Sequence, residues 1–219
     1  MTLIKTCCIK NSEELQLAIQ NGTSAVGFVS AMPSGPGVID EKLIAELADL
    51  VPPGISSFLL TCKQDVPAII DQQKRCRVNT IQLVDRMDHH SHLELKKAMP
   101  GIKIVQVIHV RGEESIMEAV SIQGGVDALL LDSGNPGKKI KELGGTGRTH
   151  NWLISRKIVE AVKVPVYLAG GLKPANVFEA VQVVRPFAVD VCSGIRTDDR
   201  LDKMKLKQFC TEVRAADLC

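Results

Sequence analysis

The sequence lacks long apolar runs, basic clusters and a secretory signal. Its longest apolar runs are far too short to span a bilayer, and no long apolar segment follows the first residues. The 27 Lys and Arg residues are scattered along the chain and leave a net charge of +2. Proteins that bind nucleic acid or membrane surfaces usually concentrate their basic residues. We therefore expect neither a membrane nor a nucleic acid as partner.

Metal-ligand spacing is also missing. The seven cysteines form no CxxC pair and no zinc-binding pattern. An odd number of irregularly spaced cysteines is typical of reduced thiols in the cytosol. The cysteine pattern therefore predicts a cytoplasmic protein with reduced thiols and no metal.

Short β-like runs alternate with helix-like segments along the whole chain. The expected strands cover 3–7, 24–29, 57–61, 80–84, 103–107, 128–132, 164–168 and 187–191. Eight βα units of about 27 residues each predict parallel strands in an α/β fold, a (β/α)8 TIM barrel that forms a single domain over residues 1–219. An open doubly wound sheet would usually have fewer strands and an early G-x-G-x-x-G motif, which is not seen.

The last two expected strands each end in a turn of small residues. The first is followed by Ala-Gly-Gly and the second by Cys-Ser-Gly. Such turns let backbone N–H groups approach an anion, and (β/α)8 barrels usually bind phosphate after strands seven and eight. Gly170, Gly171 and Gly194 are therefore candidates for a phosphate site. The alternative is that these glycines only make tight turns.

Two strand ends carry groups that can transfer protons. Asp132 follows three leucines, and desolvation of its carboxylate would be costly inside an apolar wall, so we expect it at the mouth of the barrel. Partial burial there would raise its pKa and suit it as an acid. Cys7 ends the first strand, where a nearby cation would favour a reactive thiolate. The alternatives are a loop-capping Asp132 and an inert buried Cys7 thiol.

Three long sequence blocks carry a family resemblance. They comprise residues 130–132 with 144–147 and Trp152, residues 168–177, and residues 185–194; shorter matches cover 5–9, 25–29 and 81–83. In these blocks the chain resembles phosphoribosylanthranilate isomerase, the (β/α)8 enzyme of tryptophan biosynthesis. The match extends over essentially the whole length.

The resemblance implies an Amadori rearrangement without a cofactor or a metal. The substrate would be a phosphorylated ribosyl amine, most simply N-(5-phosphoribosyl)anthranilate, and the product 1-(2-carboxyphenylamino)-1-deoxyribulose 5-phosphate. Carried over by position, Asp132 would protonate the ring oxygen and Cys7 would remove the C2′ proton. The phosphate would lie on backbone amides around Gly145, Gly170, Gly171, Ser193 and Gly194.

Three positions depart from the family pattern. The loop after the second strand lacks the Arg that clamps the anthranilate carboxylate in the family, Cys8 replaces a glycine, and residues 84–85 are Val-Asp in place of His-Gly. Because Arg is well suited to clamp a planar carboxylate, Arg86 and Arg111, just past strand ends, are candidates to substitute for it. The alternative is that both are solvated surface residues.

Two other functions remain open. One is a related phosphoribosyl isomerase or epimerase with a different aglycone, and the other is a non-catalytic barrel that binds a phosphorylated metabolite. The sequence is compatible with a monomer or a homodimer.

Overall fold

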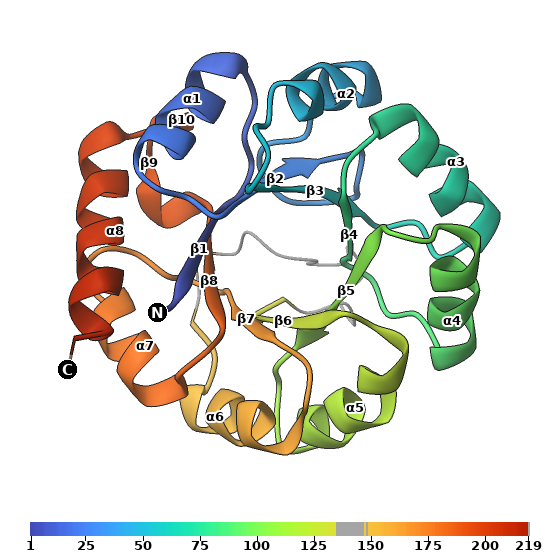
Figure 1. Cartoon of the computed structure of the whole chain (residues 1–219). Helices are drawn as coiled ribbons and strands as arrows, with labels where there is room; N and C mark the ends of the chain where they lie inside the picture. The colour runs from blue at the N-terminus through green and yellow to red at the C-terminus, as the bar shows by residue number, and fades with distance from the viewer. Residues whose placement is uncertain (135–146, 148, 219) are drawn as a thin grey trace.

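The computed structural model describes residues 1–134, 147 and 149–218 and confirms the expected barrel (Figure 1). In this part of the chain, eight parallel strands pair in sequence order, and β1 pairs with β8 to close the ring. The strands are β1 (Leu3–Thr6), β2 (Ala25–Val29), β3 (Ser56–Thr61), β4 (Thr80–Leu83), β5 (Lys103–His109), β6 (Ala128–Asp132), β7 (Val166–Leu168) and β8 (Ala188–Val191).

Helices surround the strands on the outside of the barrel (Figure 1). They are α1 (Ser12–Gln20), α2 (Glu41–Asp49), α3 (Val66–Cys76), α4 (His89–Ala98), α5 (Glu114–Ile122), α6 (Trp152–Ala161), α7 (Val177–Val184) and α8 (Lys203–Ala216). Two 3-10 turns, η1 (Gln123–Gly125) and η2 (Ser193–Ile195), and a small antiparallel hairpin of β9 (Arg196–Thr197) and β10 (Arg200–Leu201) complete the described fold. The sequence pattern did not predict this hairpin.

Short polar side chains set the start of most helices. In six of the described helices an Asn or Asp at the N-cap accepts a hydrogen bond from a backbone N–H of the first turn. These caps are Asn11, Asp40, Asp65, Asp88, Asn151 and Asp202. Each cap therefore limits the length of the loop that joins a strand end to its helix.

The core has two layers because successive side chains of a strand point to opposite faces. Leu129 and Leu131 of β6 pack in the layer between the strands and the helices. Ala128 and Leu130 belong to a separate cluster that includes Cys7 and fills the barrel interior. Asp132 continues the inward-facing series, which directs its side chain to the mouth of the barrel.

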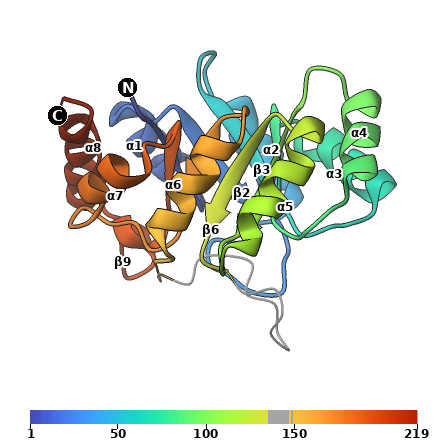
Figure 2. The same cartoon turned by 90° about the horizontal axis from the view of Figure 1, so that it is seen from below.

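Figure 2 shows both chain termini at one end of the barrel, on the face opposite the strand β9. None of the described helices is long and apolar enough to cross a membrane.

Candidate active site

A pocket opens at the carboxyl ends of the strands. The described residues of its wall come from the ends of β1, β2, β3, β4, β6, β7 and β8 and from the loops that follow several of them. The predicted site residues on this wall are Cys7, Asp132, Gly170, Gly171 and Ser193. Gly145 lies outside the described residues. The structure therefore brings the predicted proton-transfer pair and most of the predicted phosphate turns into one pocket.

The turn after β7 requires glycine at two positions. Gly170 and Gly171 have φ angles of +83° and +65°, in the left-handed region that glycine adopts without steric cost. A Cβ on Gly170 would also lie 3.1 Å from the Ser133 backbone nitrogen. Asn176 fastens the turn, because its Oδ1 accepts from the Lys173 N–H at 2.8 Å. The backbone of this turn is therefore exposed to the pocket just before α7 begins.

Gly194 lies behind the pocket wall, unlike the other described residues of the predicted phosphate site. It is not among the described residues of the pocket wall, whereas its neighbour Ser193 is. A Cβ on Gly194 would overlap the backbone oxygen of Leu172. Gly194 therefore lets the turn after β8 pack directly against the turn after β7, and this contact holds the two turns together.

Cys7 lies beside a buried ion pair. Its inward-facing neighbour on β1 is Lys5, whose Nζ lies 2.9 Å from Oδ1 of Asp190 on the adjacent strand β8. A Cβ on Gly27 would approach both Cys7 Sγ, at 2.8 Å, and Lys5 Nζ, at 3.1 Å. Because Gly27 has no side chain, the Cys7 thiol and the Lys5 ammonium group can both occupy the space beside it.

Burial governs the ionisation of these groups. Burial raises the pKa of Cys7 to about 11, although the Lys5 ammonium opposes this shift. Burial alone would lower the pKa of Lys5, but Asp190 and Cys7 together raise it above its usual value. Lys5 is therefore a permanent positive charge beside the thiol, and it offsets part of the effect of burial on the Cys7 pKa.

Asp132 lies at the end of β6 and is only 8% exposed. Burial raises the pKa of its carboxyl group, while a hydrogen bond of 2.7 Å from the Ser133 N–H to Oδ1 and the nearby His109 oppose the shift. The group is thus shifted toward the protonated form that an acid catalyst needs. Cys7 and Asp132 reach the pocket from β1 and β6, two strands that are not neighbours in the barrel.

The structure does not bring Arg86 or Arg111 to the pocket. Both are exposed, and neither is among the described lining residues. Arg86 instead reaches α5, where its Nε lies 3.4 Å from Glu118 Oε1. Since β5 continues to His109, Arg111 lies only a few residues before α5. The prediction that one of them forms the carboxylate clamp is not supported by these positions.

Comparison with known proteins identifies the family. The model of N-(5′-phosphoribosyl)anthranilate (PRA) isomerase matches residues 4–212. The chain belongs to the PRA isomerase family. The isomerase of Methanocella arvoryzae is 32% identical over 217 residues, which cover 98% of this chain and 99% of that protein. Isomerase 2 of Methanosarcina mazei is 36% identical over 208 residues, covering 94% and 91%. The solved structure of the Thermotoga maritima isomerase superimposes with a TM-score of 0.84 at 26% identity and covers 98% of this chain and all of that one.

One finding corrects the expectation of reduced thiols. Cys8 and Cys192 form a disulfide, with their Cα atoms 5.9 Å apart. Cys8 stands where the family pattern has a glycine. The two residues are 184 positions apart in the sequence, and only the pairing of β1 with β8 brings them together. Spacing along the chain could not reveal this pair.

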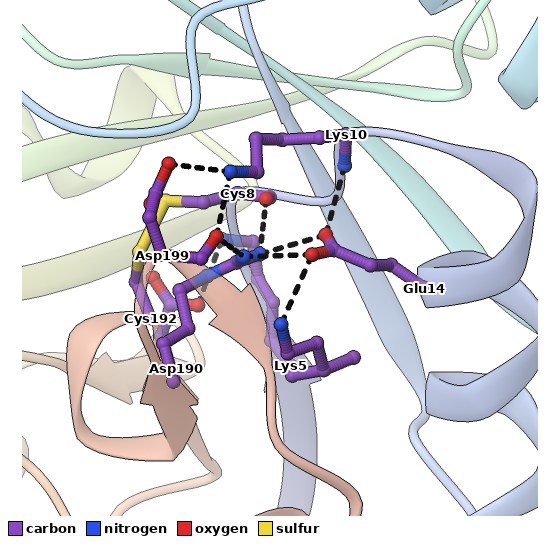
Figure 3. The surroundings of a disulfide bond; sticks show 9 residues. Lys5, Cys8, Lys10, Glu14, Asp190, Cys192 and Asp199 are labelled. Carbon is purple, nitrogen blue, oxygen red and sulfur yellow. Dashed lines mark hydrogen bonds and ion pairs between the residues drawn. A yellow bond between two sulfur atoms is a disulfide. The ribbon is translucent and has the colours of Figure 1, made fainter.

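A charged cluster supports the disulfide from the outside (Figure 3). Glu14 binds the buried Arg196 guanidinium through two contacts, of 2.8 Å at Nη1 and 2.9 Å at Nη2. Arg196 also donates to the backbone oxygen of Cys8. Nearby, Lys10 Nζ lies 2.5 Å from Asp199 Oδ2 in the β9–β10 hairpin. The cluster ties α1 and the hairpin to the backbone that follows Cys7.

Three buried polar residues of this PRA isomerase barrel were not predicted from the sequence. Lys5 and Asp190 lie within strands, and their two-residue spacing to Cys7 and Cys192 was a signal that they share the inward face. The third is Gln82 of β4, which lines the pocket and is 3% exposed. Its Oε1 is buried and has no hydrogen-bond partner among the described residues.

Proposed function

We propose that the protein converts N-(5′-phosphoribosyl)anthranilate to 1-(2-carboxyphenylamino)-1-deoxyribulose 5-phosphate in tryptophan biosynthesis. Membership of the PRA isomerase family supports the reaction class. The observation that carries the proposal is that one pocket of this barrel holds Cys7 and Asp132 together with the glycine turn after β7. These are the parts that proton transfer on a phosphorylated sugar needs.

Asp132 is the proposed acid. Its carboxyl group donates a proton to the furanose ring oxygen, the bond from C1′ to that oxygen breaks, and the amine nitrogen lone pair forms an iminium ion. A raised pKa keeps the proton available for this step.

Cys7 is the proposed base. Its thiolate removes the proton from C2′, and the electron pair left behind neutralises the iminium ion and gives an enolamine. Return of a proton at C1′ then yields the amino ketose. Because protons and electrons only move within the substrate and this pair, the reaction needs no external oxidant or reductant.

The phosphate group is the proposed anchor of the substrate. Backbone amides around Gly170, Gly171 and Ser193 are the candidate donors, with α7 following the first turn. No Lys or Arg is among the described residues of the pocket wall. Neutral backbone groups therefore carry the phosphate interaction in this part of the site.

The absence of Lys and Arg from the described pocket wall favours a second candidate substrate class. An aglycone without a carboxylate would suit a described wall that presents Met32, Pro36 and the Gln82 amide but no cation. The chemistry at Cys7 and Asp132 would be unchanged, because it involves only the ribose carbons and the ring oxygen.

The deciding experiment is steady-state turnover with N-(5′-phosphoribosyl)anthranilate generated in situ, in parallel with the analogue made from aniline. Turnover that is faster with the anthranilate compound supports the first candidate. Turnover only with the aniline analogue supports the second. Binding of inorganic phosphate without turnover of either compound contradicts both isomerase assignments.

The pH dependence should show a broad plateau. The active form has an ionised Cys7 and a protonated Asp132, although the pKa of Cys7 is raised to about 11. Between the pKa of Asp132 and about pH 11, each unit rise in pH increases the fraction of Cys7 thiolate about tenfold and decreases the fraction of protonated Asp132 about tenfold. The product of the two fractions, which sets the amount of active enzyme, therefore stays constant. We therefore expect kcat/KM to be flat through neutral pH and to fall as pH drops below the Asp132 pKa. A basic limb that begins below about pH 9 would point to a base other than Cys7.

A further inference from the structure

The Cys8–Cys192 disulfide lies inside the candidate active site. Both cysteines are on the described pocket wall. Cys8 follows the proposed base Cys7 directly, and Cys192 directly precedes Ser193 of the proposed phosphate site. A covalent bond therefore joins the two functional halves of the pocket.

The two ends of this bond are held unequally. Cys8 is 4% exposed, and the backbone oxygen of Cys8 accepts from the buried Arg196. Its Cβ occupies the space that a Cβ on Gly37 would need. Cys8 also has a φ of +63°, so its position is fixed by these surroundings and not by its own preference.

The other end is less constrained. Cys192 is half-buried and is followed by an exposed Ser193. The backbone oxygen of Cys192 accepts from the Ile195 N–H at 3.4 Å, which is long for a hydrogen bond. If the bond is reduced, the two sulfur atoms must separate to van der Waals distance. The movement should therefore occur at Cys192 and displace the Ser193 backbone from the phosphate site.

We propose that Cys8 and Cys192 are a reversible redox modification site that controls phosphate binding, an inference that rests on the proposed phosphate site. The oxidant is a low-molecular-weight disulfide. The Cys192 thiolate attacks it, forms a mixed disulfide and releases one small thiol; the Cys8 thiolate then attacks the Cys192 sulfur and releases the second. The protein loses two electrons and two protons, and the small disulfide gains them. A dithiol reverses the reaction through the solvent-open pocket.

The oxidised protein is the form that binds phosphate tightly, because the bond fixes the turn after β8 to the backbone that follows β1 and so keeps the Ser193 backbone in place. We expect the Kd for inorganic phosphate to rise about tenfold on reduction, within the usual range of coupling between two sites. Linkage requires the reciprocal effect. Saturating phosphate should lower the midpoint potential of the disulfide by about 30 mV. For a two-electron couple, this shift corresponds to the same tenfold change in equilibrium constant.

The test is calorimetric titration with inorganic phosphate after equilibration of the protein with oxidised glutathione or with a dithiol. Thiol titration confirms each state, since the chain has seven cysteines and the disulfide uses two of them. The double variant Cys8→Gly/Cys192→Ser removes both sulfur atoms of the disulfide and should have one Kd in both buffers. Cys62→Ser is the matched control, because Cys62 is a free, partly exposed thiol outside the pocket wall, and its response should equal the wild type.

Two outcomes in the wild type overturn the proposal on its own. One is an equal phosphate Kd in both states of the wild type, and the other is seven titratable thiols after oxidation. Failure of phosphate to bind in either state overturns it together with the proposed phosphate site. A redox response that persists in the double variant also overturns it, because the response would then come from another cysteine.

Discussion

Replacing Asp132 with Asn is expected to lower kcat/KM by about 100- to 10,000-fold, the range typical of removing a general acid. An Asn side chain has the same shape, and its amide oxygen can still accept the Ser133 N–H that Asp132 Oδ1 accepts at 2.7 Å. The amide cannot transfer a proton to the ring oxygen. The loss should therefore appear in kcat, with little change in KM, when turnover of N-(5′-phosphoribosyl)anthranilate is measured at steady state.

A matched control separates this effect from a general loss of charge. Asp49 is an exposed carboxylate that pairs with Arg77 on the outside of the barrel. Asp49→Asn makes the same chemical change away from the pocket and should leave kcat and KM at wild-type values. If Asp132→Asn keeps turnover within about threefold of wild type, the acid is another group and the proposed mechanism is wrong.

The fold could be predicted because its signals are local. Each βα unit shows its apolar strand and its amphipathic helix within about 27 residues, and eight such units leave few arrangements other than a closed barrel. The place of Cys7 and Asp132 at the pocket could be predicted for a similar reason. Polar or reactive residues at the carboxyl ends of strands share one face of any (β/α)8 barrel, whatever the details of packing.

The features that were missed depend on ring closure or on the path of one side chain. Lys5 meets Asp190, and Cys8 meets Cys192, only because β1 pairs with β8 at the closure of the barrel. Arg86 follows a strand end as expected, but its long side chain reaches outward to Glu118. Sequence position gives the location of a Cα atom and not the direction that a flexible side chain takes from it.

Replacing Lys5 with Met is expected to lower the free energy of unfolding by about 3–5 kcal/mol, the usual result of removing one partner of a buried ion pair. Lys5 is fully buried and Asp190 is 8% exposed, so the remaining carboxyl group would lose its partner and could not be solvated well. Unfolding in urea, followed at constant pH, measures this loss.

The same substitution should impair the proposed base. Lys5 lowers the pKa of Cys7 against the larger effect of burial, so its removal raises that pKa above about 11. The thiolate then becomes scarcer at every pH below that value, and the plateau of kcat/KM should fall. The rate at which Cys7 is alkylated as a function of pH, read from its peptide by mass spectrometry, reports the shift without any substrate.

A second variant distinguishes a purely structural Lys5 from one that acts on Cys7. Lys5→Met/Asp190→Asn leaves no unpaired buried charge, so most of the lost stability should return, as it often does when both partners of a buried pair are made neutral. The Cys7 pKa should nevertheless stay above its wild-type value, because Lys5 lowers it more than Asp190 raises it. If the double variant instead alkylates Cys7 with the wild-type pH dependence, Lys5 only neutralises Asp190. If alkylation remains shifted while stability recovers, the ammonium group tunes the thiol independently of its contribution to the fold.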